Sequence, residues 1–110
     1  MKLPDAENAI IDLRKLTDYC LNPDHPRGKH KAQVFESALG LTAEDAEILR
    51  DALLQAVQAA DAIEGEHDEY GQRDTIDFEM IGHTGQATIR SVWIIRTDEN
   101  FPRLVSCFVR

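Results

Sequence analysis

The second half of the chain has the residue patterns of β-strands. Apolar and polar residues alternate regularly in TIDFEM (75–80). QATIRSVWIIR (86–96) predicts a longer strand whose second part is apolar on both faces, as in a central strand covered by helices, and RLVSCFV (103–109) predicts the last strand. The residues between the first two of these segments, GHTG (82–85), are typical of a hairpin turn. The pattern predicts an antiparallel meander of three strands, or of four strands if residues 9–12 or 66–72 pair at an edge.

The first half has the periodicity of helices instead. Apolar positions predict helices over about 13–21, 29–39 and 43–63, and the third has the longest apolar stripe. TAED (42–45) is typical of an N-cap followed by acids in the first turn. Residues 64–74 are polar and acidic and are expected to form a linker. Helices followed by an antiparallel sheet define an α+β fold, and 110 residues are enough for one domain, 1–110.

The formal net charge of −8 is concentrated in one segment. Residues 41–80 hold two basic and twelve acidic side chains. Residues 1–40 hold six of each, and residues 81–110 hold four basic and two acidic ones. A locally basic surface is therefore compatible with the composition, so the net charge does not exclude a nucleic acid as a partner.

The apolar segments and the two cysteines indicate where the protein is located and whether it contains a disulfide. No apolar run approaches the roughly 20 residues of a membrane helix. The first residues carry acids and a proline where a signal peptide needs an apolar stretch, so a cytoplasmic location is expected. Cys20 and Cys107 lie in apolar patterns and are interpreted as buried thiols rather than as a disulfide.

The segment LNPDHPRGKHKAQVF (21–35) combines prolines, a glycine, histidines and basic residues ahead of the second helix. We call residues 21–31 the basic loop. A helix N-terminus beside cations is suited to a phosphate or carboxylate, and a histidine there can exchange protons near neutral pH. The alternative is a Pro–Gly corner whose charges are solvated. His25 and His30 have no standard ligand spacing, so no metal site and no cofactor are predicted.

Arginines also mark the predicted sheet. Arg73, Arg90 and Arg103 precede or interrupt apolar strand segments, and an exposed face with arginines and hydroxyls is suited to a phosphate ester. Such a face is equally suited to a cross-strand pair between Arg90 and Asp77. Tyr70 could stack on a base or anchor the linker.

Three blocks carry a resemblance that covers nearly the whole chain: LNPDHPRGKHKAQVF, then YGQR, and then IRSVWIIR followed by FPRLVSCFV. In this order and spacing they resemble a bacterial domain-of-unknown-function family. Similar modules occur at the C-termini of large phage-related or contact-dependent toxin proteins. The order of helices and strands is similar to that of the small ribonuclease toxins related to barnase, EndoU and RelE.

The resemblance implies a metal-independent ribonuclease-toxin-like protein that acts on RNA phosphodiesters. The family's polar signature falls on His25, Gly28, Lys31, Tyr70, Gly71, Asp77, Arg90, Trp93, Pro102 and Arg103. The expected catalytic residues are His25, His30, Lys31 and Arg90, and the expected substrate-binding residues are Arg27, Lys29, Tyr70, Arg73, Arg103 and Ser106. The chain departs from the family at Ser106, where threonine is expected, and at Asp74, where an aromatic residue is expected.

Two other classes of function are compatible with the sequence. The acidic segment favours a non-enzymatic binding module, an antitoxin or immunity-like partner of a basic protein. A structural domain that dimerises through an edge of its meander is the third class. The predicted partners are therefore RNA or a cognate toxin or antitoxin, and no membrane.

Overall fold

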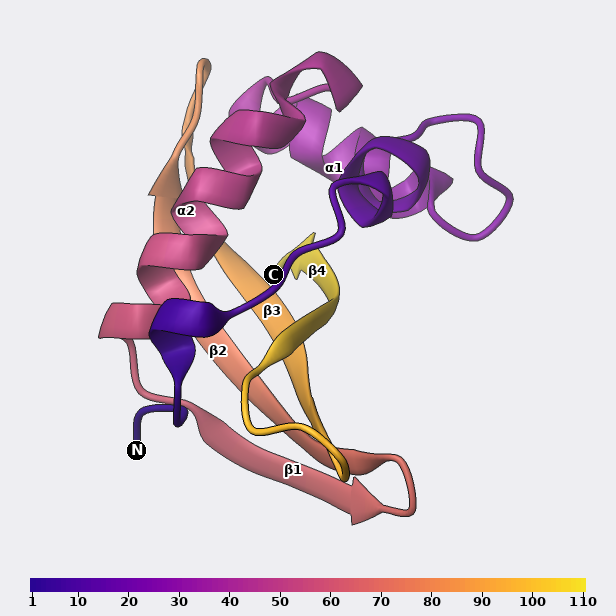
Figure 1. The fold of residues 1–110 in the computed structure, drawn as a ribbon. Coiled ribbons are helices and arrows are strands. Elements are labelled where there is room, and N and C mark those ends of the chain that lie inside the picture. The colour runs from indigo at the N-terminus through magenta and orange to yellow at the C-terminus, as the bar shows by residue number, and fades with distance from the viewer.

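The computed structural model describes residues 1–110 and has helices first and strands second, which confirms the α+β class (Figure 1). The helical half contains α1 (Lys29–Leu39) and α2 (Ala46–Ala59), with 3-10 turns at Ala6–Asn8 and Ala43–Asp45 and a π-helical turn at Leu16–Cys20. The strands are β1 (Ile63–Asp68), β2 (Gly71–Ile81), β3 (Gln86–Arg96) and β4 (Arg103–Val109). None of the helices has the length and apolar character that crossing a bilayer requires.

The helices differ from prediction mainly at the ends. The prediction for α1 is confirmed, and the helix ends at Gly40, which adopts the left-handed conformation typical of a C-cap. The predicted 43–63 helix is too long, because the chain turns extended at Ala60 and Ile63 already pairs with Thr75 in the sheet. The helix predicted over about 13–21 is present over residues 14–20, but most of it is the π-helical turn Leu16–Cys20 and not a regular α-helix.

The four strands form one antiparallel sheet in chain order, β1-β2-β3-β4. The expected linker at 64–74 is wrong, because most of it belongs to β1 and to the first residues of β2. Every residue of β1 is exposed, so this strand has no apolar alternation by which a sequence pattern could reveal it. On the opposite edge, Ile10 forms an isolated parallel bridge with Arg103 and covers part of β4.

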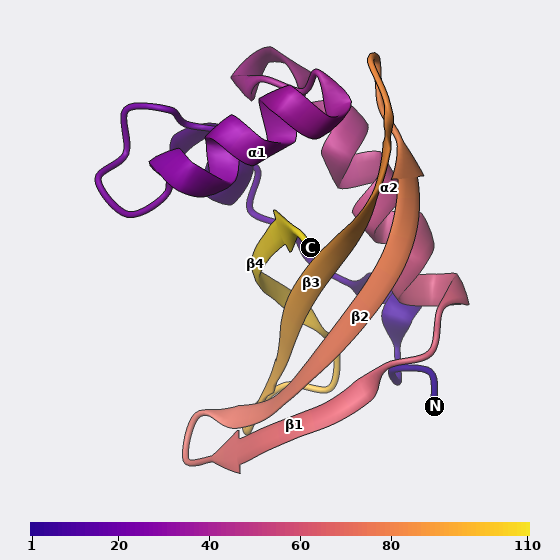
Figure 2. The same ribbon diagram turned by 180° about the vertical axis from the view of Figure 1, so that it is seen from behind.

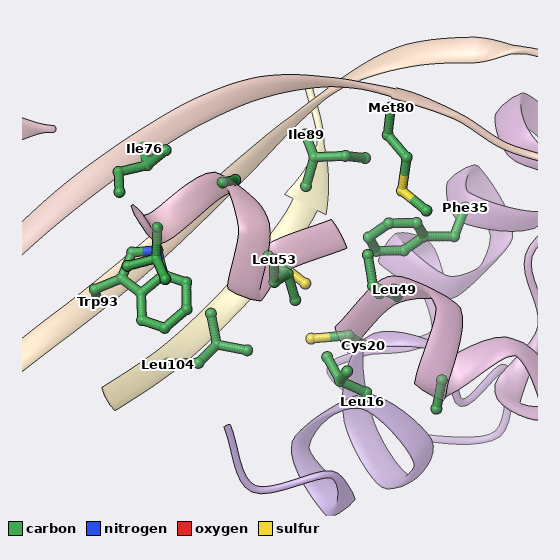
Figure 3. Packing of buried hydrophobic residues seen from close by; sticks show 14 of the residues in the cluster. Leu16, Cys20, Phe35, Leu49, Leu53, Ile76, Met80, Ile89, Trp93 and Leu104 are labelled. Carbon is green, nitrogen blue, oxygen red and sulfur yellow. The ribbon is translucent and has the colours of Figure 1, made fainter. Parts of the chain in front are cut away.

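Helices α1 and α2 pack on one face of the sheet and enclose the core (Figures 1 and 3). Trp93 and Phe35 are the largest fully buried side chains. The Trp93 Nε1–H donates to Ser91 Oγ at 2.9 Å, and the Ser91 hydroxyl donates to the carbonyl oxygen of Ile76 at 2.8 Å. These two hydrogen bonds satisfy the indole N–H of Trp93 and the hydroxyl of Ser91, which are both buried in the core.

The two cysteines meet where the π-helical turn packs against β4. Both are buried free thiols, which confirms their predicted burial. The hydrogen bond between the two thiols lowers the pKa of Cys20 and, together with burial, raises that of Cys107. The Cys20 Sγ also lies 3.9 Å from Ser106 Oγ, so Ser106 belongs to this contact.

Helix α2 leaves the other face of the sheet free, and α1 reaches that face only at the end of β4, where Lys31 lies over the Phe108 ring (Figure 2). Because side chains alternate along a strand, residues directly opposite a partner share its face. Pairing therefore sets two rows on this side: Arg73, Ile94 and Arg103 in one, and Asp77, Arg90 and Phe108 in the other. We call this side of β2, β3 and β4 the open face.

Candidate functional site

Six of the ten predicted site residues fall into two groups at different ends of the open face. His30, Lys31 and Arg90 lie near the end of β4, and Tyr70, Arg73 and Arg103 lie near its beginning. His25, Arg27 and Lys29 lie in the basic loop or at the start of α1.

His25 organises the basic loop. Its Nδ1 accepts hydrogen bonds from the backbone N–H groups of Arg27 and Gly28, both at 3.0 Å. Its ring meets Tyr19 edge-on, with centroids 4.8 Å apart. A Cβ at Gly28 would lie 2.3 Å from the Tyr19 carbonyl oxygen, so glycine is required for this close approach. The loop is thus a rigid corner, and the Arg27 and Lys29 side chains on it are exposed.

A shallow hollow of about 250 Å³ lies where α1 meets the end of β4. We call it the rim hollow; its lining residues are His30, Lys31, Val34, Phe108 and Val109. The Lys31 Nζ donates to the Tyr19 hydroxyl at 2.9 Å and lies 5.8 Å from the centre of the Phe108 ring. His30 is exposed, so its imidazole is accessible to solvent. The hollow therefore combines a proton-exchanging group, a fixed ammonium and an aromatic surface.

Arg90 lies directly opposite Phe108 in the sheet and is held by Asp77. Its Nε and Nη2 each donate to one Asp77 oxygen at 2.9 Å, which confirms the cross-strand pair that the sequence allowed. Arg110 Nη1 donates to the same carboxylate at 2.7 Å. Two guanidinium groups thus share one carboxylate, and one of them, Arg90, lies on the strand position opposite Phe108, which lines the rim hollow.

Acid is expected to weaken this arrangement. The hydrogen bond from Arg90 holds the pKa of Asp77 below its ordinary value of 3.8. A carboxyl whose pKa is depressed by folding stabilises the protein above its unfolded pKa, and this contribution is lost as the pH falls through the folded pKa. We therefore expect Asp77→Asn to be less stable than the parent at pH 7, with a difference that shrinks below about pH 3.8.

Urea unfolding at neutral and at acid pH measures this difference. The matched control is Glu47→Gln, since Glu47 is an exposed carboxylate on α2 that makes no ion pair. A difference between Asp77→Asn and its parent that is equal at both pH values would contradict the expectation.

A second hollow of about 350 Å³ opens at the beginning of β4. We call it the basic groove; it is lined by Ile10, Asp12, Lys15, Tyr70, Arg73, Ile94, Arg96, Arg103, Leu104 and Val105. Arg73 Nη1 donates to Asp68 at 2.7 Å, and Arg103 donates through Nε and Nη2 to the two Glu99 oxygens at 2.7 Å each. The groove thus gathers three of the predicted substrate-binding residues.

Two basic residues of the groove were missed by sequence reasoning. Arg96 lies six residues after Arg90 on β3, so strand alternation could have placed it on the same face. Lys15 could not have been found in this way, because it follows the N-terminal segment that the bridge between Ile10 and Arg103 brings to β4. Ser106, by contrast, lines neither hollow and contacts Cys20 instead.

Comparisons with known proteins agree with the fold. A family model described as a domain of unknown function, DUF6883, matches residues 2–110. A solved structure of a contact-dependent growth inhibition toxin–immunity protein complex from Klebsiella pneumoniae 342 contains a chain of similar fold, with a TM-score of 0.66 and 16% identity. The match covers 96% of each chain. The search of curated proteins gave no match.

Proposed function

The chain belongs to the DUF6883 family, and from its rim hollow we propose that it is a small metal-independent ribonuclease of the toxin type, acting on RNA phosphodiesters. The observation that carries the proposal is the convergence of His30, Lys31 and Arg90 around Phe108. The protein of similar fold comes from a toxin–immunity complex, which supports a role in such a system.

The proposed reaction uses each of these groups once. The His30 imidazole takes the proton from a ribose 2′-OH, and the 2′ oxygen forms a bond to phosphorus. The bond between phosphorus and the 5′ oxygen breaks, and the Lys31 ammonium gives a proton to the departing oxygen. The Arg90 guanidinium, fixed by Asp77, stabilises the negative charge of the phosphorane. The products are a 2′,3′-cyclic phosphate and a 5′-hydroxyl.

His25 is assigned a positioning role in this scheme. Its Nδ1 lone pair is occupied by two backbone N–H groups, so this nitrogen is not free to accept a substrate proton. The same two hydrogen bonds fix the corner from which α1 begins. His25 therefore acts through the placement of His30 and Lys31.

Growth arrest and RNA cleavage test the proposal. We expect induced expression in bacteria to stop growth, and purified protein to cut RNA in the presence of EDTA and leave cyclic phosphate ends. His30→Gln is expected to lower the cleavage rate about 100-fold or more, the range typical of general acid–base catalysis. Because His30 is exposed, this substitution should leave folding unchanged, as circular dichroism would verify.

The matched control is Gln33→Ala, which changes another exposed residue of α1 that lines neither hollow. It should cleave RNA at the parent rate. Normal growth together with no RNA cleavage by folded, purified protein would contradict the ribonuclease. Equal rates for His30→Gln and Gln33→Ala would contradict the assignment of His30.

A second candidate is favoured by the acidic surface of β1. This strand is fully exposed at the edge of the sheet and carries Glu64, Glu66 and Asp68. An immunity-like protein that masks a basic toxin would use such a surface, because charge complementarity speeds association. Expression that protects cells from a co-expressed toxin, without any RNA cleavage by the chain itself, would favour this candidate.

A further inference from the structure

We propose that the basic groove binds a nucleotide of single-stranded RNA that flanks the cleaved one, with its phosphate on the arginines and its base stacked on Tyr70. This inference rests on the proposed function for the identity of the ligand. It adds a second binding site, distinct from the rim hollow, and it assigns roles to Lys15 and Arg96.

The charges that line the groove favour an anionic ligand. Four cations line it, one each from the N-terminal segment, β2, β3 and β4, whereas its only acidic lining residue, Asp12, is paired with Arg14. Lys15 and Arg96 make no ion pair and are exposed, so both can bind a phosphate without first losing a partner.

The two remaining arginines are positioned for the same ligand. Arg73 and Arg103 lie on either side of Ile94 in one cross-strand row, so their backbones are about 10 Å apart. Each is held by a carboxylate outside the lining of the groove. Arg103 uses only Nε and Nη2 for this purpose, which leaves the Nη1 donors for a phosphate oxygen.

Tyr70 supplies the surface for a base. Its side chain is 64% exposed, although its backbone is fixed by hydrogen bonds to Asp68 and Thr97. An exposed aromatic ring beside guanidinium groups matches a base next to a phosphate. An acidic peptide would use the cations and would have no need of the ring, so the groove favours a nucleic acid strand.

The distance between the two sites fits one continuous strand of RNA. Ile94 lies in the cross-strand row with Arg73 and Arg103, which line the groove. Arg90, which lies opposite Phe108 of the rim hollow, is four residues earlier on β3. Four residues of β-strand span about 13 Å, which a single strand of RNA covers in a few nucleotides. The open face between them carries Val92 and no covering helix (Figure 2).

The test is binding of a fluorescein-labelled RNA of roughly 12 nucleotides, measured by anisotropy at about 50 and 200 mM salt. It is carried out in the full chain with His30→Gln, so that the RNA stays intact. We expect Tyr70→Ala to weaken binding roughly tenfold and Tyr70→Phe to retain it. We expect Arg96→Ala to reduce the slope of log Kd against log salt by about 0.7, the value for one phosphate contact on a single strand.

Arg50→Ala is the matched control, because it removes the same charge from α2, outside the groove. If Arg96→Ala and Tyr70→Ala behave like Arg50→Ala, the inference is overturned. It is also overturned if polyglutamate of equal charge displaces the RNA from the parent and from Tyr70→Ala alike.

The outcomes separate this inference from the proposed function. Binding that depends on Arg96 and Tyr70, in a protein that cuts no RNA, would support the groove and remove the ribonuclease. RNA cleavage by a protein whose binding is insensitive to both substitutions would support the ribonuclease and remove the groove.

Discussion

Trp93→Ala is expected to lower the free energy of unfolding by about 3–5 kcal/mol, enough to unfold much of a small domain at physiological temperature. Trp93 is fully buried at the centre of β3, and its removal leaves a large cavity under the helices (Figure 3). It also removes the Nε1–H donor to Ser91. Urea denaturation followed by far-ultraviolet circular dichroism measures the change, since Trp93 is the sole tryptophan and its fluorescence disappears with it.

The control for this prediction is Trp93→Phe. Phenylalanine retains an aromatic ring in the core and loses the hydrogen bond to Ser91, so a smaller loss of roughly 1–2 kcal/mol is expected. Equal losses for the two variants would show that the donor, and not the volume of the ring, dominates the contribution of Trp93.

Gly71→Ala is expected to destabilise the protein by about 2–6 kcal/mol, from backbone strain and steric overlap together. Gly71 has a φ of 144°, a conformation that other residues rarely adopt. A Cβ here would lie 2.2 Å from the carbonyl oxygen of Ile95 on the neighbouring strand. The clash with backbone cannot be relieved by a side-chain rotation, so the pairing of β2 with β3 must shift.

Glu69→Ala is the matched control, because Glu69 is an exposed residue of the same turn. Its loss of stability should stay within about 0.5 kcal/mol. Thermal unfolding of both variants beside the parent measures the effect. A Gly71→Ala variant as stable as Glu69→Ala would mean that the turn rearranges without loss of the strand pairs.

The sequence was sufficient for those elements whose apolar faces are buried. The predicted strands 86–96 and 103–109 match β3 and β4, whose core residues include Ile89, Trp93 and Leu104. The second part of 86–96 is apolar on both faces, but the expectation that helices cover both is wrong, because Ile94 on the open face is only half-buried. β1 forms through backbone pairing with β2 and buries none of its own side chains, so its residues contain no hydrophobic pattern. The end of α2 was missed for a related reason, since Ala62 and Ile63 continue an apolar stretch after the helix has stopped.

The sequence indicated which types of residue belong to the candidate site, but it indicated only in part which of them lie close together in the fold. The pair between Arg90 and Asp77 follows from strand alternation and a short hairpin. Arg73 and Arg103 lie in one cross-strand row because the pairing of β3 with β4 shifts register between Val92 and Trp93, and no local pattern in the sequence specifies this shift. The roles of Tyr19 and Lys15 depend on where the N-terminal residues pack, and this is decided by tertiary contacts.

The acidic edge strand has a consequence for self-association. A strand with unpaired backbone groups on one side can pair with the same strand of another molecule. When two copies approach through β1, Glu64, Glu66 and Asp68 of each bring like charges together, and the resulting repulsion disfavours edge-to-edge pairing. The opposite edge is partly covered by Ile10 of the same chain. The negative charge of this segment therefore protects the chain from aggregating with itself, a benefit that requires no partner.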